Sequence, residues 1–159
     1  MPRGRGRTDR QPKASINPAP GPLVPKALSN YLGDDGSHKH PVFSLSLVDR
    51  AYDGDWGWKL TDADSHRLLR LLCDMAAISW NAVRAQTAGG HKRHHYQPVT
   101  SLCSPARRRL RELELQDFDD RMFRFRDGAT GRLWGFERDG IFYVVWWDPN
   151  HRVYPTEAA

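Results

Sequence analysis

Three stretches in the last third of the chain have the apolar pattern of strands, and turn residues separate them. They cover Met122–Arg126, Arg132–Arg138 and Ile141–Trp147. Their β-branched and aromatic residues, partly in period-two alternation, favour extended structure. Asp139-Gly140 is the dipeptide of a two-residue type I′ hairpin, and Asp127–Gly131 supplies a longer turn. The pattern therefore predicts a three-stranded antiparallel meander.

The Asp139-Gly140 turn also predicts a register. Residues at equal distance from it should face each other, which places Phe136 opposite Tyr143 and Trp134 opposite Val145. Continued along the hairpin, the same rule sets Arg132 opposite Trp147. The alternate face, with Leu133 paired to Trp146, is more uniformly apolar, and we expect it to pack on helices. Arg124 and Arg126 share one face of the first strand, but the longer turn leaves open which sheet face they join.

Helical periodicity precedes the strands. Thr61-Asp-Ala-Asp64 has the spacing of a capping box, and a helix is expected after it, with apolar positions at Leu68, Leu69, Leu72, Met75 and Ala76. Ser79 can cap a short second helix over Trp80–Gln86. Ser104-Pro105 is an N-cap followed by proline at the first helical position, and it predicts a third helix over Ala106–Leu113.

The segments before and between these helices are less regular. Residues 42–48 and 56–60 alternate in part and predict an N-terminal hairpin, while residues 87–103 have no period and predict a loop. The fold class expected is α+β, with N-terminal strands and short helices packed on a C-terminal three-stranded antiparallel meander.

Composition divides the chain of 159 residues into a tail and a domain. Residues 1–40 are rich in proline and poor in large apolar side chains, so we predict a disordered basic tail before a single domain at 41–159. The arginines between Arg3 and Arg7 fit either an RNA-binding arm or a solubilising tail. With two cysteines and no apolar run longer than the seven residues Ile141–Trp147, we expect no disulfide framework, membrane span or signal peptide, and a cytoplasmic location.

The formal charge of +5 is unevenly distributed. Residues 91–111 hold six basic and no acidic side chains, whereas 112–159 are acidic overall. This polarity favours a surface that meets phosphate groups. The candidate phosphate contacts in the basic stretch are Lys92, Arg93, Arg107, Arg108, Arg109 and Arg111. His91, His94, His95 and Cys103 are also present there, but their spacing fits no standard zinc pattern. No metal site and no cofactor are predicted.

The C-terminal strands carry a further pattern. Arg132 opens the middle strand within Gly131-Arg132-Leu133, and His151-Arg152-Val153-Tyr154 follows the last one. Across Met122–Tyr154, about a fifth of the chain, this order resembles the RelE/ParE-type toxin superfamily of RelE-, YoeB- and HigB-like proteins.

The resemblance implies a metal-independent endoribonuclease that cleaves mRNA, with the ribosome and an antitoxin protein as partners. Attack of a ribose 2′-hydroxyl on phosphate needs an acid, a base and positive charge. His151 would be acid or base, Arg132 would hold the phosphate, and Tyr154 would position the hydroxyl or stack on a base. Further RNA contacts are expected from Arg124, Arg126, Trp134 and Tyr143.

Each of these residues also has a structural interpretation. His151 can bond Asp148, Arg132 can lie over Trp147 as a cation–π pair, and Tyr154 can anchor the chain end. No lysine occurs in 104–159, although many RelE-type nucleases use lysines. The alternative is therefore a non-catalytic module that binds nucleic acid or protein through the same sheet and the basic 91–111 segment.

Overall fold

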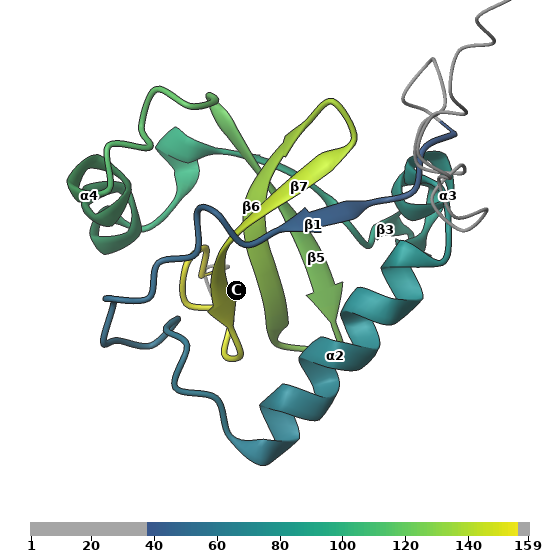
Figure 1. Cartoon of the computed structure of the whole chain (residues 1–159), viewed down its shortest axis with the longest axis horizontal. Coiled ribbons are helices and arrows are strands. Elements are labelled where there is room, and N and C mark those ends of the chain that lie inside the picture. Colours follow the sequence, from purple (N-terminus) through teal and green to yellow (C-terminus); the bar gives the residue numbers. More distant parts are fainter. Residues whose placement is uncertain (1–37, 156–159) are drawn as a thin grey trace, which may run out of the picture.

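The apolar strands of the last third form the centre of a five-stranded sheet. The computed structural model describes residues 38–155, and its sheet has the order β1-β7-β6-β5-β4 (Figure 1). The three central strands pair antiparallel, as the pattern predicted. They are β5 (Arg121–Asp127), β6 (Gly131–Arg138) and β7 (Ile141–Asp148). Asp139 and Gly140 both have positive φ, of 55° and 82°, which is the backbone of a type I′ turn.

The edges of the sheet differ from the prediction. β1 (Val42–Ser44) pairs with β7 in parallel, and residues 56–60 form no strand, so the predicted N-terminal hairpin is wrong. At the other edge β4 (His95–Pro98) pairs antiparallel with β5. The sheet is therefore mixed, with parallel and antiparallel pairs. A parallel pair needs a long connection rather than a tight turn, so β1 and β7 do not form a hairpin.

A β-bulge interrupts the β6–β7 hairpin next to Gly135. Phe136 faces Tyr143 as predicted, but beyond Gly135 the pairing slips by one residue, so that Trp134 faces Trp146 and not Val145. A side chain at Gly135 would begin 2.2 Å from the carbonyl oxygen of Tyr143. The extra residue of β7 thus lies opposite Gly135, where the partner strand has no Cβ. The predicted register is therefore wrong from Trp134 to Arg132.

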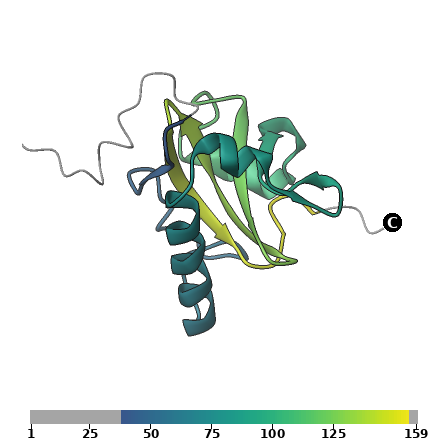
Figure 2. The same ribbon diagram turned by 90° about the vertical axis from the view of Figure 1, so that its right-hand side faces the viewer.

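Two helices cover one face of the sheet (Figures 1 and 2). α2 (Asp62–Ala76) begins at Thr61, whose hydroxyl accepts the Asp64 N–H, and α3 (Trp80–Ala85) begins at Ser79 in the same way. Leu69 was expected in the core but is 61% exposed. The first core cluster joins buried residues of α2 and α3 to the sheet: Leu68, Leu71, Met75, Trp80, Val83, Phe123, Phe125, Leu133, Phe142, Val144 and Trp147.

The opposite face of the sheet is covered as well. α4 (Ser104–Glu112) packs there, with Cys103 rather than Ser104 at its N-cap position. Its Ala106 and Leu110 join a second buried cluster that includes Trp134 and Trp146. We expected Trp146 on the same face as Leu133; the bulge sends it to the α4 face and places Trp147 with Leu133 on the α2 face.

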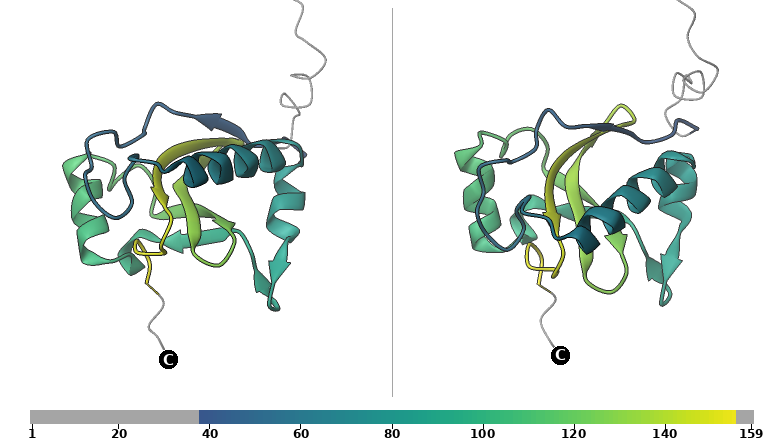
Figure 3. Two further views of the ribbon diagram at one scale, coloured as in Figure 1. Left: turned by 90° about the horizontal axis from the view of Figure 1, so that it is seen from below. Right: turned by 60° about the horizontal axis from the view of Figure 1, so that its bottom comes forward.

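The segment predicted as a loop contains short strands. β2 (Thr87–Ala88) and β3 (His91–Lys92) form a small hairpin, β4 follows, and a 3₁₀ turn at Val99–Ser101 leads to α4. Strands of two to four residues are too short to show a period, which is why the pattern missed them. Figure 3 shows the hairpin and α4 at opposite ends of the molecule.

The folded unit begins slightly before residue 41. The Trp80 N–H donates to the Lys39 carbonyl at 2.8 Å, and His40 Nδ1 is 2.9 Å from the Ala76 carbonyl oxygen. The predicted disordered tail otherwise lies outside the described residues. Within residues 38–155, none of the helices combines the length and apolar character that a membrane span requires.

Candidate functional site

Arginine and histidine side chains of three strands meet the C-terminal turn on the α4 face of the sheet. β4 supplies His95, β5 supplies Arg124 and Arg126, β6 supplies Arg132, and the turn after β7 supplies His151. We call these five residues the arginine–histidine cluster. The pairing of β5 with β6 decides what the sequence left open, because Arg124 faces Trp134 and Arg126 faces Arg132.

Arg124 lies between two imidazoles. One guanidinium nitrogen, Nη2, is 2.6 Å from His95 Nε2, and the other, Nη1, is 3.2 Å from His151 Nε2. Since a guanidinium only donates, both imidazoles accept through Nε2 and are neutral. Residues 56 positions apart are thereby joined through one side chain of β5.

Arg126 and Arg132 form a cross-strand pair of like charge. Opposed cations destabilise a sheet, and Arg132 is only 4% exposed. Burial and the neighbouring Arg124 and Arg126 lower the pKa of Arg132 to about 10, so it remains charged at neutral pH. This arrangement has an electrostatic cost that a bound anion would relieve.

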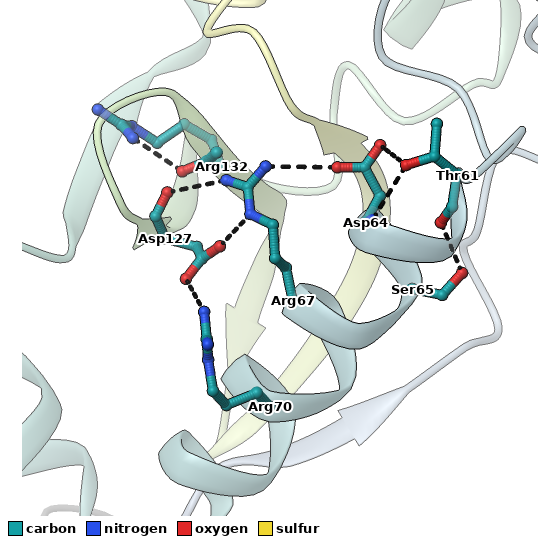
Figure 4. A network of polar contacts seen from close by, with 8 residues as sticks. Thr61, Asp64, Ser65, Arg67, Arg70, Asp127 and Arg132 are labelled. Carbon is teal, nitrogen blue, oxygen red and sulfur yellow. Dashed lines mark hydrogen bonds and ion pairs between the residues drawn. The ribbon is translucent and has the colours of Figure 1, made fainter.

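The nearby carboxylates are engaged elsewhere. Arg67 and Arg70 converge on Asp127, whereas the Arg132 guanidinium points away from it and donates to the Gly131 carbonyl (Figure 4). Asp148 accepts the backbone N–H groups of Arg152 and Val153, at 2.9 Å each.

As a result the cluster is not neutralised. No ion pair within residues 38–155 includes an arginine of the cluster. The Nε atoms of Arg124 and Arg132 are buried, and neither has a hydrogen-bond partner in the described part of the chain. Unused donors beside buried positive charge are what a phosphate site requires.

His151 occupies a strained position in the C-terminal turn, with φ of 58°. Asp148 binds the backbone of this turn and not the imidazole, so the structural interpretation of His151 as a partner of Asp148 is wrong. Burial, followed by Arg132, Arg124 and Arg126, lowers the pKa of His151 to about 4. A non-glycine residue with positive φ is costly and is typical of functional sites.

His95 is the member of the cluster that the sequence identified neither as catalytic nor as an RNA contact. Its Nδ1 lies 2.9 Å from the Tyr96 carbonyl oxygen and donates to it, which leaves the Nε2 lone pair directed at Arg124. Burial lowers its pKa. The only signal was its place among the histidines of the basic stretch, and a strand of four residues gave no face on which to put it.

The neighbouring His94 has a different role. It is 1% exposed, its Nδ1 accepts the Arg126 N–H at 2.9 Å, and its Nε2 lies 3.0 Å from Gln86 Oε1. Burial, then the surrounding cations, lowers its pKa to about 4. His94 therefore joins the end of α3, at Gln86, to β5 as a neutral side chain.

The aromatic residues that were predicted to contact RNA lie in different parts of the structure. Tyr154 is half-buried, with its ring 6.4 Å from that of His151, and so it lies beside the cluster. Trp134 is fully buried, and its burial excludes a stacked base in this conformation. Tyr143 packs on Phe118 near the far end of β7. Arg67, and not Arg132, lies over Trp147.

The predicted basic contacts of 91–111 do not form one surface. Lys92 and Arg93 belong to the β2–β3 hairpin region, while the arginines of α4 lie at the opposite end (Figure 3). Arg109 is bound to Asp49 and Glu112, Arg108 pairs with Glu112, and Arg107 donates to Ser104. Arg111 is exposed on the same helix.

Within residues 38–155, no three His, Cys, Asp or Glu side chains are arranged to hold a metal ion. His94 accepts the backbone N–H of Arg126, His95 accepts from the side chain of Arg124, and Cys103 lies at the start of α4. No protein-family model, curated protein or solved structure matches the chain. The inference of function therefore depends on the site itself.

Proposed function

We propose that the chain is a metal-independent endoribonuclease that cleaves the RNA backbone at the arginine–histidine cluster. The observation that carries this proposal is Arg124 held between the imidazoles of His95 and His151, next to the un-neutralised Arg132. Together they supply the groups that transphosphorylation of RNA needs: a base, an acid and positive charge at the phosphoryl oxygens.

The reaction follows from these positions. His95 Nε2 takes the proton of the ribose 2′-hydroxyl, since the Tyr96 carbonyl fixes the tautomer with the proton on Nδ1. The 2′-oxygen attacks phosphorus, and the bond from phosphorus to the 5′-oxygen breaks. Protonated His151 gives that oxygen its proton, leaving a 2′,3′-cyclic phosphate and a 5′-hydroxyl.

The arginines connect substrate binding to this proton transfer. When phosphate oxygens accept the N–H groups of Arg124, the imidazoles lose their donor and Nε2 of each becomes available. The phosphate charge also offsets the arginines that hold the pKa of His151 low. Arg132 contributes charge from the buried floor of the site, and Tyr154 positions the 2′-hydroxyl or stacks on a base.

The proposal extends to the biological setting. Arg132 in the middle strand of the meander, followed by His151 and Tyr154 after its last strand, resembles the order in RelE-like toxins. We therefore propose mRNA on the ribosome as the substrate, in the cytoplasm. An antitoxin protein would then restrain the activity. The exposed arginines of α4 are available for ribosomal RNA or an acidic partner.

A second candidate is a non-catalytic nucleic-acid- or protein-binding module. It is favoured by one observation: Arg124 occupies Nε2 of both His95 and His151, the atoms that catalysis needs. On this interpretation the cluster binds phosphate and the hydrogen bonds only orient Arg124. RNA binding with a steep salt dependence and no cleavage would favour it, and binding that is insensitive to charge reversal at Arg107–Arg109 would argue against its use of α4.

The test is cleavage itself. The full chain is induced in a heterologous host and mRNA ends are mapped, and the purified chain is incubated with RNA with and without ribosomes. We expect growth arrest and new 5′-hydroxyl ends. His95→Ala and His151→Ala should each lower the rate by about 10²–10⁴-fold, which is the usual contribution of a general acid or base.

Arg111→Ala is the matched control, because Arg111 is an exposed arginine of α4 at the other end of the molecule. On purified RNA without ribosomes, where no ribosomal contact of α4 is involved, it should cleave like the parent chain. Circular dichroism of each variant separates loss of chemistry from loss of fold. Unchanged mRNA, or equal cleavage by the His151→Ala, Arg132→Ala double variant, would overturn the catalytic proposal.

A further inference from the structure

A pocket of about 530 Å³ lies beside α2, separate from the arginine–histidine cluster. α2 forms one side of it, and the other sides come from the end of α3, the segment after β3 and the β5–β6 turn. None of the five cluster residues lines it. Its volume is in the range of small-molecule sites, and polar as well as apolar atoms line it.

The α2 side of the pocket has an apolar part. Leu71 and Met75 lie one turn apart on this helix and are buried, and Ile78 follows the helix end. Leu71 and Met75 belong to the first core cluster, so packing fixes their positions. A hydrocarbon or aromatic group of a ligand would bury apolar surface against them.

The arginines of the pocket differ in how far they are already engaged. Each of the three guanidinium nitrogens of Arg67 has a partner in Asp64 or Asp127 (Figure 4). Arg70 reaches Asp127 only at 3.6 Å, beyond hydrogen-bond distance, and is 65% exposed. In the part of the chain that the structure describes, no ion pair includes Arg93. Arg70 and Arg93 therefore retain donors for a ligand.

Gln86 adds a neutral donor on the side opposite α2. His94 Nδ1 accepts the Arg126 N–H, so His94 carries its proton on Nε2 and donates it to Gln86 Oε1 at 3.0 Å. This bond fixes the amide with its oxygen toward His94 and leaves the Gln86 N–H groups unused by it. Donors thus come from both sides of the pocket.

We propose that this pocket binds a small organic anion, with its phosphate or carboxylate group on Arg70 and Arg93 and its body on the apolar part of the α2 side. Guanidinium groups are the side chains that bind both kinds of anion best. Asp127 is already shared by Arg67 and Arg70, so the charge of Arg93 is left for a ligand to offset. The inference does not depend on RNA cleavage, because it uses other residues.

NMR spectra of the full chain with labelled methyl groups test the site. The probes are phenyl phosphate, phenylacetate, inorganic phosphate, acetate and benzyl alcohol. We expect the two ring-bearing anions to shift the methyl signals of Leu71, Met75 and Ile78. Phosphate and acetate lack the ring and benzyl alcohol lacks the charge, so each should need at least about tenfold higher concentration. The tighter of the two ring-bearing anions distinguishes a phosphate from a carboxylate ligand.

Substitutions of opposite charge should have opposite effects. Arg70→Gln and Arg93→Gln should each weaken the binding of phenyl phosphate about tenfold, because a charged hydrogen bond is lost. Asp74 is an exposed lining residue of α2 that no arginine pairs within residues 38–155. Asp74→Asn should therefore strengthen binding, by about threefold. A merely structural role of these side chains would not produce both signs.

Arg111→Gln is the matched control, because Arg111 is an exposed arginine of α4 outside the pocket. It should bind phenyl phosphate like the parent chain, and the spectra without probe show whether each variant keeps its fold. The site would be overturned if neither ring-bearing anion shifted the three methyl signals of the parent chain. Benzyl alcohol binding as tightly as these anions, or binding unchanged by Arg70→Gln combined with Arg93→Gln, would also overturn it.

Discussion

At the scale of single residues, the site depends on the charge around His151. Three arginines face this imidazole, and with burial they hold its pKa at about 4. His151 can act as an acid near neutral pH only if bound substrate raises its pKa again, because an imidazole must carry a proton to donate one. The arginines and the histidine are therefore parts of one electrostatic unit, and their coupling can be measured.

The first prediction concerns that coupling. Arg132→Gln removes the largest charge contribution at His151, so the pKa of His151 should rise from about 4. Saturating inorganic phosphate should raise it in the parent chain as well. The measurement is an NMR titration of the His151 ring protons. Arg111→Gln, on α4, should leave the curve unchanged, and a pKa of His151 that ignores both Arg132→Gln and phosphate would disprove the coupling.

His94 gives a second prediction, on stability against pH. Its pKa is about 4 in the folded chain, against an ordinary value near 6.5 in the unfolded chain. Between these values the unfolded state binds more protons, so the free energy of unfolding falls as pH falls from 6.5 toward 4. Protonation of Nδ1 would also remove the acceptor of the Arg126 N–H.

Urea unfolding at pH 7, 6, 5 and 4 measures this loss. His94→Gln should be less stable at pH 7, because a buried hydrogen bond is lost, and its stability should vary less with pH. His66→Gln is the control, since His66 is an exposed histidine of α2, and it should keep the slope of the parent chain. A parent stability that stays flat down to pH 4 would contradict the prediction.

At the scale of elements, a buried carboxylate links the chain before α2 to the α4 face. Asp49 is 2% exposed and accepts Arg109 through both carboxylate oxygens, at 2.8 and 2.7 Å, as well as Trp146 Nε1 at 3.0 Å. Burial alone would raise the pKa of Asp49, but the hydrogen bonds of Arg109 and Trp146 outweigh it and hold the pKa below its usual value. One side chain thus joins this segment, a helix and the central sheet.

Asp49→Ala should therefore be strongly destabilising. It leaves the Arg109 charge and the Trp146 N–H without their acceptor, and breaking a buried pair in this way costs about 3–5 kcal/mol. Chemical unfolding checks the value. Asp53→Ala breaks an exposed pair with Lys59 and should cost less than about 1 kcal/mol. Similar losses for the two variants would contradict the role given to Asp49.

The elements also show how far the sequence can predict this fold. The three central strands and the two Thr61- and Ser79-capped helices followed from periodicity and caps, because each is long enough or has a distinct cap. The slip at Gly135 did not, since it is set by the approach of the Tyr143 carbonyl across the hairpin. Parallel β1 and the short β4 depend on long-range pairing that leaves no local pattern. The same limit applies to the candidate site. Arg132, Arg124 and His151 could be singled out because they lie on regular strands or in the turn that follows them, whereas His95 was missed because it lies in a segment without a period.

At the scale of the whole molecule, positive charge is separated into two regions. The arginine–histidine cluster lies at the meeting of β4, β5 and the C-terminal turn, whereas the arginines of α4 lie at one end of the molecule (Figure 3). Two α4 arginines, Arg108 and Arg109, are neutralised by Asp49 and Glu112. The net charge of +5 therefore does not locate an RNA surface, and the two regions should differ in how they contribute to binding.

Salt dependence separates the two regions. Each phosphate contact with single-stranded RNA contributes about −0.7 to the slope of log K against log salt concentration. Arg124→Gln and Arg126→Gln should each make the slope shallower by about this amount, because their charges are not paired within the described residues. Arg109→Gln should leave it unchanged, since Asp49 already neutralises that guanidinium, although the variant should be less stable. The measurement is fluorescence anisotropy with a short labelled RNA carrying 2′-O-methyl groups, which blocks cleavage. If the slope changes in Arg109→Gln and not in Arg124→Gln, the RNA binds on α4 and not at the cluster.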